Sequence, residues 1–292
     1  MIVVTSPTGL IGHQVLKHLL QGTEPIRVIA RDPARLAEES RERVEIVQGS
    51  HGDRAVVDQA FDGANSIFWL VPPDPRAESV DAAYVDFSQP AVNAIVRHGV
   101  ERVVSISALG RGVPLNAGYV SASLAMDDLI ASTGVNFRAL TMPSFMDNIL
   151  RQVGSIKSQG RFFSPISGDR KFPSCATRDI AAVAANLLLD HSWSGQDSVP
   201  VLGPEDLSFN DMARIMSDSL GTPVCFQQIP GEAFKANLTG FGMSDAMAQG
   251  MLDMTVAKGN GLDNAVVRTP RSSTPTTFQQ WCEDVLKPAV AA

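Results

Sequence analysis

A short turn with two glycines near the start of the chain is its strongest chemical signal. Apolar residues 2–4 precede this turn, and apolar side chains at helical spacing follow it, which predicts strand, tight turn and helix. Such a turn points backbone N–H groups at an anion, and the helix dipole adds to the attraction. Many α/β proteins that bind no dinucleotide also contain such a turn. The residues expected to hold a pyrophosphate here are Ser6, Thr8, Gly9, Leu10, Ile11 and Gly12.

Two arginines follow the second apolar run, residues 26–30. The end of this predicted strand faces the adenosine ribose in a dinucleotide-binding unit. Arg31 and Arg35 stand there, and a guanidinium can grip a 2′-phosphate through two bonds. The sequence therefore favours NADP(H). The neighbouring Asp32 leaves NAD(H) open, and the alternative is that both arginines are solvated surface charges.

The overall composition excludes several classes of protein. The chain has 292 residues, 44% of them hydrophobic, and a net charge of −7 without a basic run, which gives nucleic-acid binding no electrostatic support. No apolar stretch reaches the ~18 residues of a membrane span. Three distant cysteines and five histidines show no disulfide or ligand spacing, so we expect no metal. We expect a cytoplasmic protein without membrane association.

Strands and helices alternate over the first half of the chain, which predicts an α/β fold with a doubly wound parallel sheet. We expect this dinucleotide-binding domain over residues 1–150, with a returning strand near 198–202, and a smaller C-terminal α+β cap domain over 151–292. Ligands of such sheets bind beyond the carboxyl ends of the strands. The corresponding segments are 5–12, 31–35, 49–53, 70–74, 107–118 and 142–148.

The chain resembles the NmrA-like family of atypical short-chain dehydrogenases/reductases along almost its whole length. The resemblance is carried by TGLIG at 8–12, RDP at 31–33, SISA at 105–108, PSFMDN at 143–148, RDIA at 178–181, GPE at 203–205 and TPTTF at 274–278. It implies a Rossmann domain, a small second domain and NADP(H) or NAD(H) between them. The cofactor contacts expected beyond the turn and the arginines are Ser50, Val71, Pro72, Ser107, Pro143, Phe145 and Asn148.

The resemblance also indicates an acid–base site, which this chain carries incompletely. In the wider family a serine at the end of the fifth strand works with a Tyr-x-x-x-Lys helix. Ser107 and Tyr119 are in place, but Ser123 occupies the lysine position. A phenol of pKa near ~10 is a poor proton relay at neutral pH without that lysine. Tyr119 is therefore either catalytic or a packing residue, and Ser107 is the donor best placed to polarise a carbonyl.

We interpret the chain as a reductase that transfers hydride to a small apolar carbonyl, quinone or enone-like acceptor. The family also contains regulators that bind the dinucleotide without turnover, so an NADP(H)-sensing protein is the alternative, and an isomerase or lyase is a third reading. The expected partners are a small-molecule substrate and, for any oligomer, a homodimer. His51 is expected at the surface, and Asp127 and Asp128 on a solvated helix face. Four methionines at helical spacing, 243 to 254, predict a buried stripe or a pocket wall.

Overall fold

The computed structural model describes residues 1–113 and 116–292, and the chain divides into two compact units. The first unit comprises residues 1–108, 121–141 and 180–199, and the second comprises 109–120, 142–179 and 200–292. The chain therefore passes between the units several times. The expected division at residue 150 stays a prediction.

A seven-stranded sheet forms the centre of the first unit, in the order β10-β6-β5-β4-β1-β2-β3. Its strands are β1 (Ile2–Thr5), β2 (Ile26–Ala30), β3 (Glu45–Gln48), β4 (Ser66–Trp69), β5 (Arg102–Ala108), β6 (Asn136–Met142) and β10 (Gln196–Pro200). β1 runs parallel to both of its neighbours, β2 and β4, so the strand order reverses there. This confirms the predicted fold class. In sheets of this kind, ligands bind beyond the carboxyl ends of the strands at the point where the order reverses.

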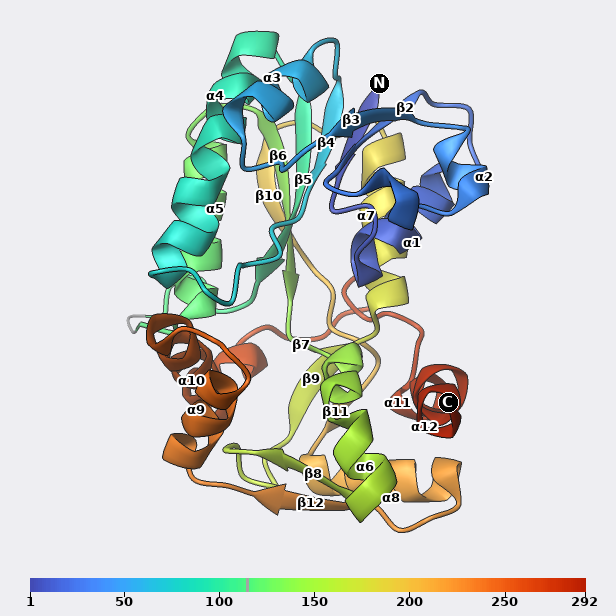
Figure 1. Cartoon of the computed structure of the whole chain (residues 1–292), viewed down its shortest axis with the longest axis vertical. Coiled ribbons are helices and arrows are strands. Elements are labelled where there is room, and N and C mark those ends of the chain that lie inside the picture. The colour runs from blue at the N-terminus through green and yellow to red at the C-terminus, as the bar shows by residue number, and fades with distance from the viewer. Residues whose placement is uncertain (114–115) are drawn as a thin grey trace. The chain divides into compact units, whose positions relative to one another are not determined.

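Helices cover both faces of this sheet. Figure 1 shows α3, α4 and α5 on one face and α1 and α7 on the other. The helices are α1 (Leu10–Leu19), α2 (Glu38–Arg41), α3 (Arg54–Phe61), α4 (Phe87–His98), α5 (Tyr119–Ala131) and α7 (Thr177–Leu189). The largest side chains of the core between sheet and helices are fully buried and include Phe61, Trp69 and Met126. Burial of these large apolar surfaces is the main force that fixes the strand ends in place.

A proline shapes the helix that follows β4. The sequence predicts one helix over residues 79–98 with a kink at Pro90, and the structure has a π-helical turn, Ala82–Asp86, followed by α4. Proline has no N–H to donate to the carbonyl four residues earlier, which is that of Asp86. The widened turn ends at that same residue, so the irregularity lies just before the proline.

The second unit combines two small sheets with several helices. One sheet has the order β11-β9-β7, and the other pairs β12 with β8. Its strands are β7 (Ser144–Phe145), β8 (Arg161–Ser164), β9 (Phe172–Cys175), β11 (Asp206–Leu207) and β12 (Cys225–Gln228). Its helices are α6 (Val153–Gln159), α8 (Phe209–Leu220), α9 (Gly231–Gly240), α10 (Asp245–Gly259), α11 (Phe278–Trp281) and α12 (Lys287–Ala291). Phe162, Met216 and Trp281 are buried in its separate core.

Candidate functional site

The turn after β1 takes the geometry of a glycine-rich phosphate loop although its first position is a serine. Ser6 has a φ of +52°, in the left-handed region that favours glycine. Its Oγ donates a hydrogen bond to the Leu70 carbonyl at 3.2 Å, and its carbonyl accepts one from the Gly9 N–H at 3.0 Å. These bonds hold the serine in a conformation that a glycine would adopt freely.

The two glycines of the turn are required for different reasons. A Cβ built on Gly12 would lie 2.1 Å from the Ser6 carbonyl oxygen, so the close packing of α1 on the turn leaves no room for a side chain. At Gly9 the φ is −86° and a Cβ would meet only an ordinary contact, 3.4 Å from the same oxygen. The folded chain therefore does not itself require glycine at position 9. The open space beside Gly9 suits a ligand that approaches the backbone.

The start of α1 has the chemistry of an anion site. Gly9 is the N-cap and offers no side chain to bond the first N–H groups, and no acidic residue lies in the first turn. The neighbouring Leu10 is 62% exposed, Thr8 is half-buried, and Ile11 points into the core. Uncapped N–H groups at a helix N-terminus bind phosphate groups well.

The arginines after β2 are available to a ligand. Arg31 and Arg35 are both exposed, and neither forms an ion pair within residues 1–113 and 116–292. The carboxylate of Asp32 accepts a hydrogen bond from the Ala34 N–H at 3.1 Å, which caps the short 3-10 turn Pro33–Arg35. The group that could bind a free ribose hydroxyl is thus engaged locally, whereas the guanidinium groups are not.

His51 is a buried residue, and its expected surface position is wrong. The residue is 7% exposed, and its ring lies edge-on to Trp69 and Phe87, which enclose it from β4 and α4. Burial, with a smaller contribution from the Arg31 charge, lowers the pKa of His51 to about 4, although the bond to Leu70 acts in the opposite direction. The imidazole is therefore neutral at pH 7, and Nε2 donates to the Leu70 carbonyl at 3.0 Å.

Three other expected cofactor contacts are Ser50, next to this histidine, and Val71 and Pro72, which follow β4. The Ser50 hydroxyl accepts a hydrogen bond from the Gly52 N–H at 3.2 Å and so shapes the loop after β3. Val71 is buried and Pro72 is exposed after β4. The contacts of these three residues with a cofactor stay predictions.

Ser107 and Asp127 form a buried pair between β5 and α5. The Ser107 hydroxyl donates a hydrogen bond to Oδ2 of Asp127, whose exposure is only 1%. The expected solvated face is therefore wrong for Asp127 and holds for Asp128, which is exposed. Asp127 lies on the face of α5 that packs on the sheet, where the Ser107 hydroxyl is its partner. Sequence reasoning could have found it, since Asp127 follows Ser123 by one helical turn.

Ser123 occupies the lysine position of the family motif and is buried, with 6% exposure. Its spacing from Asp127 places the two on one stripe of α5. No lysine is present between residues 17 and 157, so that stripe carries no cationic group in place of the lysine. The catalytic roles of Ser107, Tyr119 and Ser123 stay predictions.

Tyr119 lies in the second unit, at the start of α5. Its side chain is 7% exposed, and its hydroxyl contacts the Met243 sulfur at 4.0 Å. Burial raises the pKa of Tyr119 to about 12, against a smaller opposing effect of the Arg151 charge. A Cβ on Gly118 would lie 1.9 Å from the Gly250 carbonyl, so α10 packs closely against this residue. These contacts favour the packing interpretation of Tyr119.

The residues expected to contact the cofactor after β6 differ in their solvent exposure. Pro143 is buried, Phe145 is half-buried on β7, and Asn148 is exposed in the 3-10 helix Met146–Gln152. Between them, Asp147 accepts hydrogen bonds from the backbone N–H and the hydroxyl of Thr177, each at 3.0 Å. Asp147 thereby satisfies the start of α7, and sequence reasoning did not single it out.

Comparison with known proteins identifies the family. The NmrA-like family matches residues 1–281 of the chain. This protein belongs to the NmrA-like family. The NmrA-like chain is 30% identical to a (4-alkanoyl-5-oxo-2,5-dihydrofuran-3-yl)methyl phosphate reductase of Streptomyces griseus, over 82% of this chain and 80% of the relative. It is 28% identical to an NAD(P)H azoreductase of Xenophilus azovorans, over 87% and 86%.

Solved structures show the same fold. An NADPH-dependent quinone oxidoreductase of Escherichia coli in complex with NADPH matches the NmrA-like chain with a TM-score of 0.77. The match covers 100% of this chain and 99% of that chain, at 21% identity.

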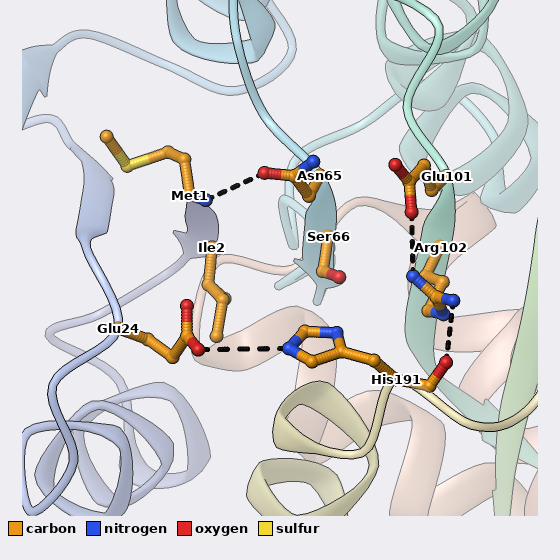
Figure 2. A pocket seen from close by; sticks show the side chains of 8 residues that line it. All are labelled: Met1, Ile2, Glu24, Asn65, Ser66, Glu101, Arg102 and His191. Carbon is orange, nitrogen blue, oxygen red and sulfur yellow. Dashed lines mark hydrogen bonds and ion pairs between the residues drawn. The ribbon is translucent and has the colours of Figure 1, made fainter.

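A pocket of about 300 Å³ lies at the opposite edge of the sheet in the NmrA-like protein, at the amino ends of β1, β4 and β5 (Figure 2). Its lining residues are Met1, Ile2, Glu24, Asn65, Ser66, Glu101, Arg102 and His191. Most of its charged groups bond one another. Arg102 donates to the Glu101 carboxylate and to the His191 carbonyl, each at 2.8 Å, and the N-terminal ammonium donates to Asn65 at 2.9 Å. We assign no function to this pocket.

Two negative findings concern the described residues, 1–113 and 116–292. Within them, no three His, Cys, Asp or Glu side chains gather as metal ligands. Likewise, no helix in that part of the chain combines the length and the apolar character needed to cross a bilayer.

Proposed function

We propose that this NmrA-like protein is an NADPH-dependent reductase that transfers hydride to a small apolar carbonyl, quinone or enone-like acceptor. The observation that carries the proposal is the turn of Ser6, Gly9 and Gly12. Ser6 takes a left-handed conformation there, and the fold leaves room for a side chain at Gly9, so a pyrophosphate could approach the backbone at this position. The names of its relatives, which include NAD(P)H-dependent reductases, support the same conclusion.

The preference for NADPH rests on the arginines. The pyrophosphate would lie against the start of α1, and the exposed Arg31 and Arg35 would hold the 2′-phosphate. Asp32 caps its own 3-10 turn, which disfavours its use on the ribose of NADH. When bound, the dinucleotide supplies the hydride. NADH remains the second candidate cofactor.

The protein residues contribute mainly by positioning. A phenol with a pKa of about 12 is a poor proton donor at neutral pH, and the family's lysine is replaced by Ser123. Holding the two reactants in a reactive geometry can by itself supply a large part of a rate enhancement. This arrangement suits acceptors such as quinones, which a hydride reduces without an active proton relay.

The test measures NADPH oxidation against a panel of quinones, enones and aldehydes, beside calorimetric titrations of NADPH and NADH. We expect tighter binding of NADPH and turnover with at least one acceptor class. Tight NADPH binding without any turnover would favour the alternative, a dinucleotide sensor, for which the missing lysine also speaks. Failure to bind either dinucleotide would contradict both.

A further inference from the structure

The hydrogen of the Ser107 hydroxyl is already engaged in the folded protein. It is donated to Oδ2 of Asp127, a side chain with 1% exposure. A serine has one hydrogen to donate and two lone pairs that accept. A hydrogen bond to a carboxylate is about twice as strong as one between neutral groups, so a neutral carbonyl would compete poorly for this hydrogen.

We infer that Asp127 is a positioning residue that makes Ser107 a hydrogen-bond acceptor, so that the site favours substrates reduced by hydride alone. This inference rests on the proposed reductase function and narrows its substrate class. The favoured acceptors are those whose hydride adducts are stable without a proton from the protein, namely quinones and conjugated cations. Simple ketones and aldehydes are disfavoured.

The chemical balance distinguishes the two classes. Hydride addition to a quinone forms one bond to hydrogen and leaves a hydroquinone monoanion, which takes its proton from water. Hydride addition to a conjugated cation gives a neutral product and needs no proton. Hydride addition to an isolated ketone leaves a strongly basic alkoxide, and its formation is accelerated by a general acid in the transition state. A Ser107 whose hydrogen is held by Asp127 cannot fill that role.

Two features of the fold make the pair a stable arrangement. Asp127 is presented by α5 and Ser107 by β5, and both residues belong to the first unit. Met126 and Ile130, which flank Asp127 on the helix, are buried in the core beneath the sheet. Because this packing fixes the helix on the strand, it holds the carboxylate beside the hydroxyl.

The first test examines the pair in the ligand-free protein and does not depend on activity. The protein is labelled with ¹³C at the aspartate carboxyl carbons, and the Asp127 signal is assigned by its loss in Asp127→Asn. We expect an ionised Asp127 carboxylate at neutral pH. Ser107→Ala removes its hydrogen bond and should raise its titration midpoint by about one pH unit or more.

The matched control is Ser105→Ala, a buried serine on the same strand whose hydroxyl contacts the Ile106 carbonyl at 3.4 Å. It should leave the Asp127 signal in place. A protonated Asp127 at neutral pH, or a midpoint that Ser107→Ala does not move, would overturn the inference, because Ser107 would then be free to donate. If Asp127→Asn does not fold, the Asp127 signal is assigned by other means, and the titration midpoints of wild type and Ser107→Ala are still compared.

The second test compares acceptors. The ratio of kcat/KM for a quinone to that for an aldehyde is measured with NADPH for wild type, Asp127→Asn and the exposed control Asp128→Asn. We expect Asp127→Asn to shift this ratio toward the aldehyde by about tenfold or more, since an amide can donate to Ser107 and free its hydrogen. Asp128→Asn should not shift it. An unchanged ratio in a folded Asp127→Asn protein would contradict the inference. A wild-type protein without any turnover would instead contradict the proposed function, and the titration of the Asp127 carboxyl group would then be the test of the Ser107–Asp127 pair.

Discussion

The two glycines of the turn after β1 have different roles, one in folding and one in the proposed binding of the dinucleotide. Gly12 is a glycine because the Ser6 carbonyl lies where its Cβ would be, whereas Gly9 has an ordinary φ and room for a Cβ. The first is thus a requirement of the fold. We propose that Gly9 instead leaves room for a pyrophosphate to approach the backbone.

Gly9→Val is expected to abolish dinucleotide binding while the protein remains folded, because the side chain fills the space beside the turn. Calorimetry with NADPH and a thermal melt on the same sample measure the two properties. Gly12→Ala is the contrasting variant and should lower thermal stability, since its Cβ meets the Ser6 carbonyl at 2.1 Å. Unchanged NADPH affinity in a folded Gly9→Val protein would reject the assignment of the turn.

Arg31 decides between the two cofactors if the site is as proposed. Arg31→Ala should weaken NADPH binding by about 1.5–3 kcal/mol, the range for a charge-assisted hydrogen bond, and should affect NADH far less. Titrations of both dinucleotides measure the difference. Arg41→Ala, an exposed arginine on α2, serves as the control. Equal losses for both dinucleotides would remove the reason to prefer NADPH.

At the scale of elements, α5 combines two kinds of polar residue on one helix. Tyr119 at its start packs on Met243, and Asp127 two turns later bonds Ser107. The lysine position of the Tyr-x-x-x-Lys pattern is Ser123, so no lysine accompanies Tyr119 on this helix. The helix therefore presents a buried phenol and a buried carboxylate where the wider family has a cation-activated phenol.

Tyr119→Phe should reduce kcat/KM for a quinone by less than ~100-fold, below the upper range for a general acid–base group. With a pKa of about 12, the Tyr119 phenol stays protonated up to pH 9, which is roughly three pH units below its pKa. The substitution should therefore also leave the pH profile of kcat/KM between pH 6 and pH 9 unchanged. Tyr84→Phe, at the other tyrosine of the chain, is the control. A Tyr119→Phe protein that binds NADPH normally and has no activity would show that another group activates the phenol.

Within the first unit as a whole, the Leu70 carbonyl joins segments that are distant in the sequence. It accepts hydrogen bonds from Ser6 in the turn after β1 and from His51 in the loop after β3. Trp69 and Phe87 bury the histidine ring from β4 and α4. Because the ring must be neutral to fit this place, the stability of the unit depends on pH.

His51 should make the protein less stable in acid. Its pKa is about 4 in the folded state and near 6.5 when exposed, so the unfolded chain binds a proton first as the pH falls. The free energy of unfolding should therefore decrease from pH 6.5 to pH 4, by an amount on the order of 3 kcal/mol from this group. Urea unfolding of wild type and His51→Gln at several pH values measures the difference. His51→Gln should flatten the dependence, and the exposed His13→Gln should not; equal slopes for all three proteins would contradict the account.

The sequence by itself determined the class of fold and the edge of the sheet where we propose that a dinucleotide binds. The periodicity of apolar residues indicates the strands and helices, and the glycines of segment 5–12 and Arg31 mark the ends of β1 and β2. Such signals are local, because a strand, a turn and the start of a helix depend on residues close together in the chain.

The tertiary structure alone decided what lies opposite each polar side chain. His51 was expected at the surface, yet Trp69 and Phe87 from distant segments enclose it. Asp127 was expected in water, yet Ser107 on another element faces it. The spacing of residues on one helix shows which side chains share a face, but the burial of that face and its hydrogen-bond partners depend on how helices and strands pack. That packing is the reason the hydroxyl expected to donate to a substrate is already donating to a carboxylate.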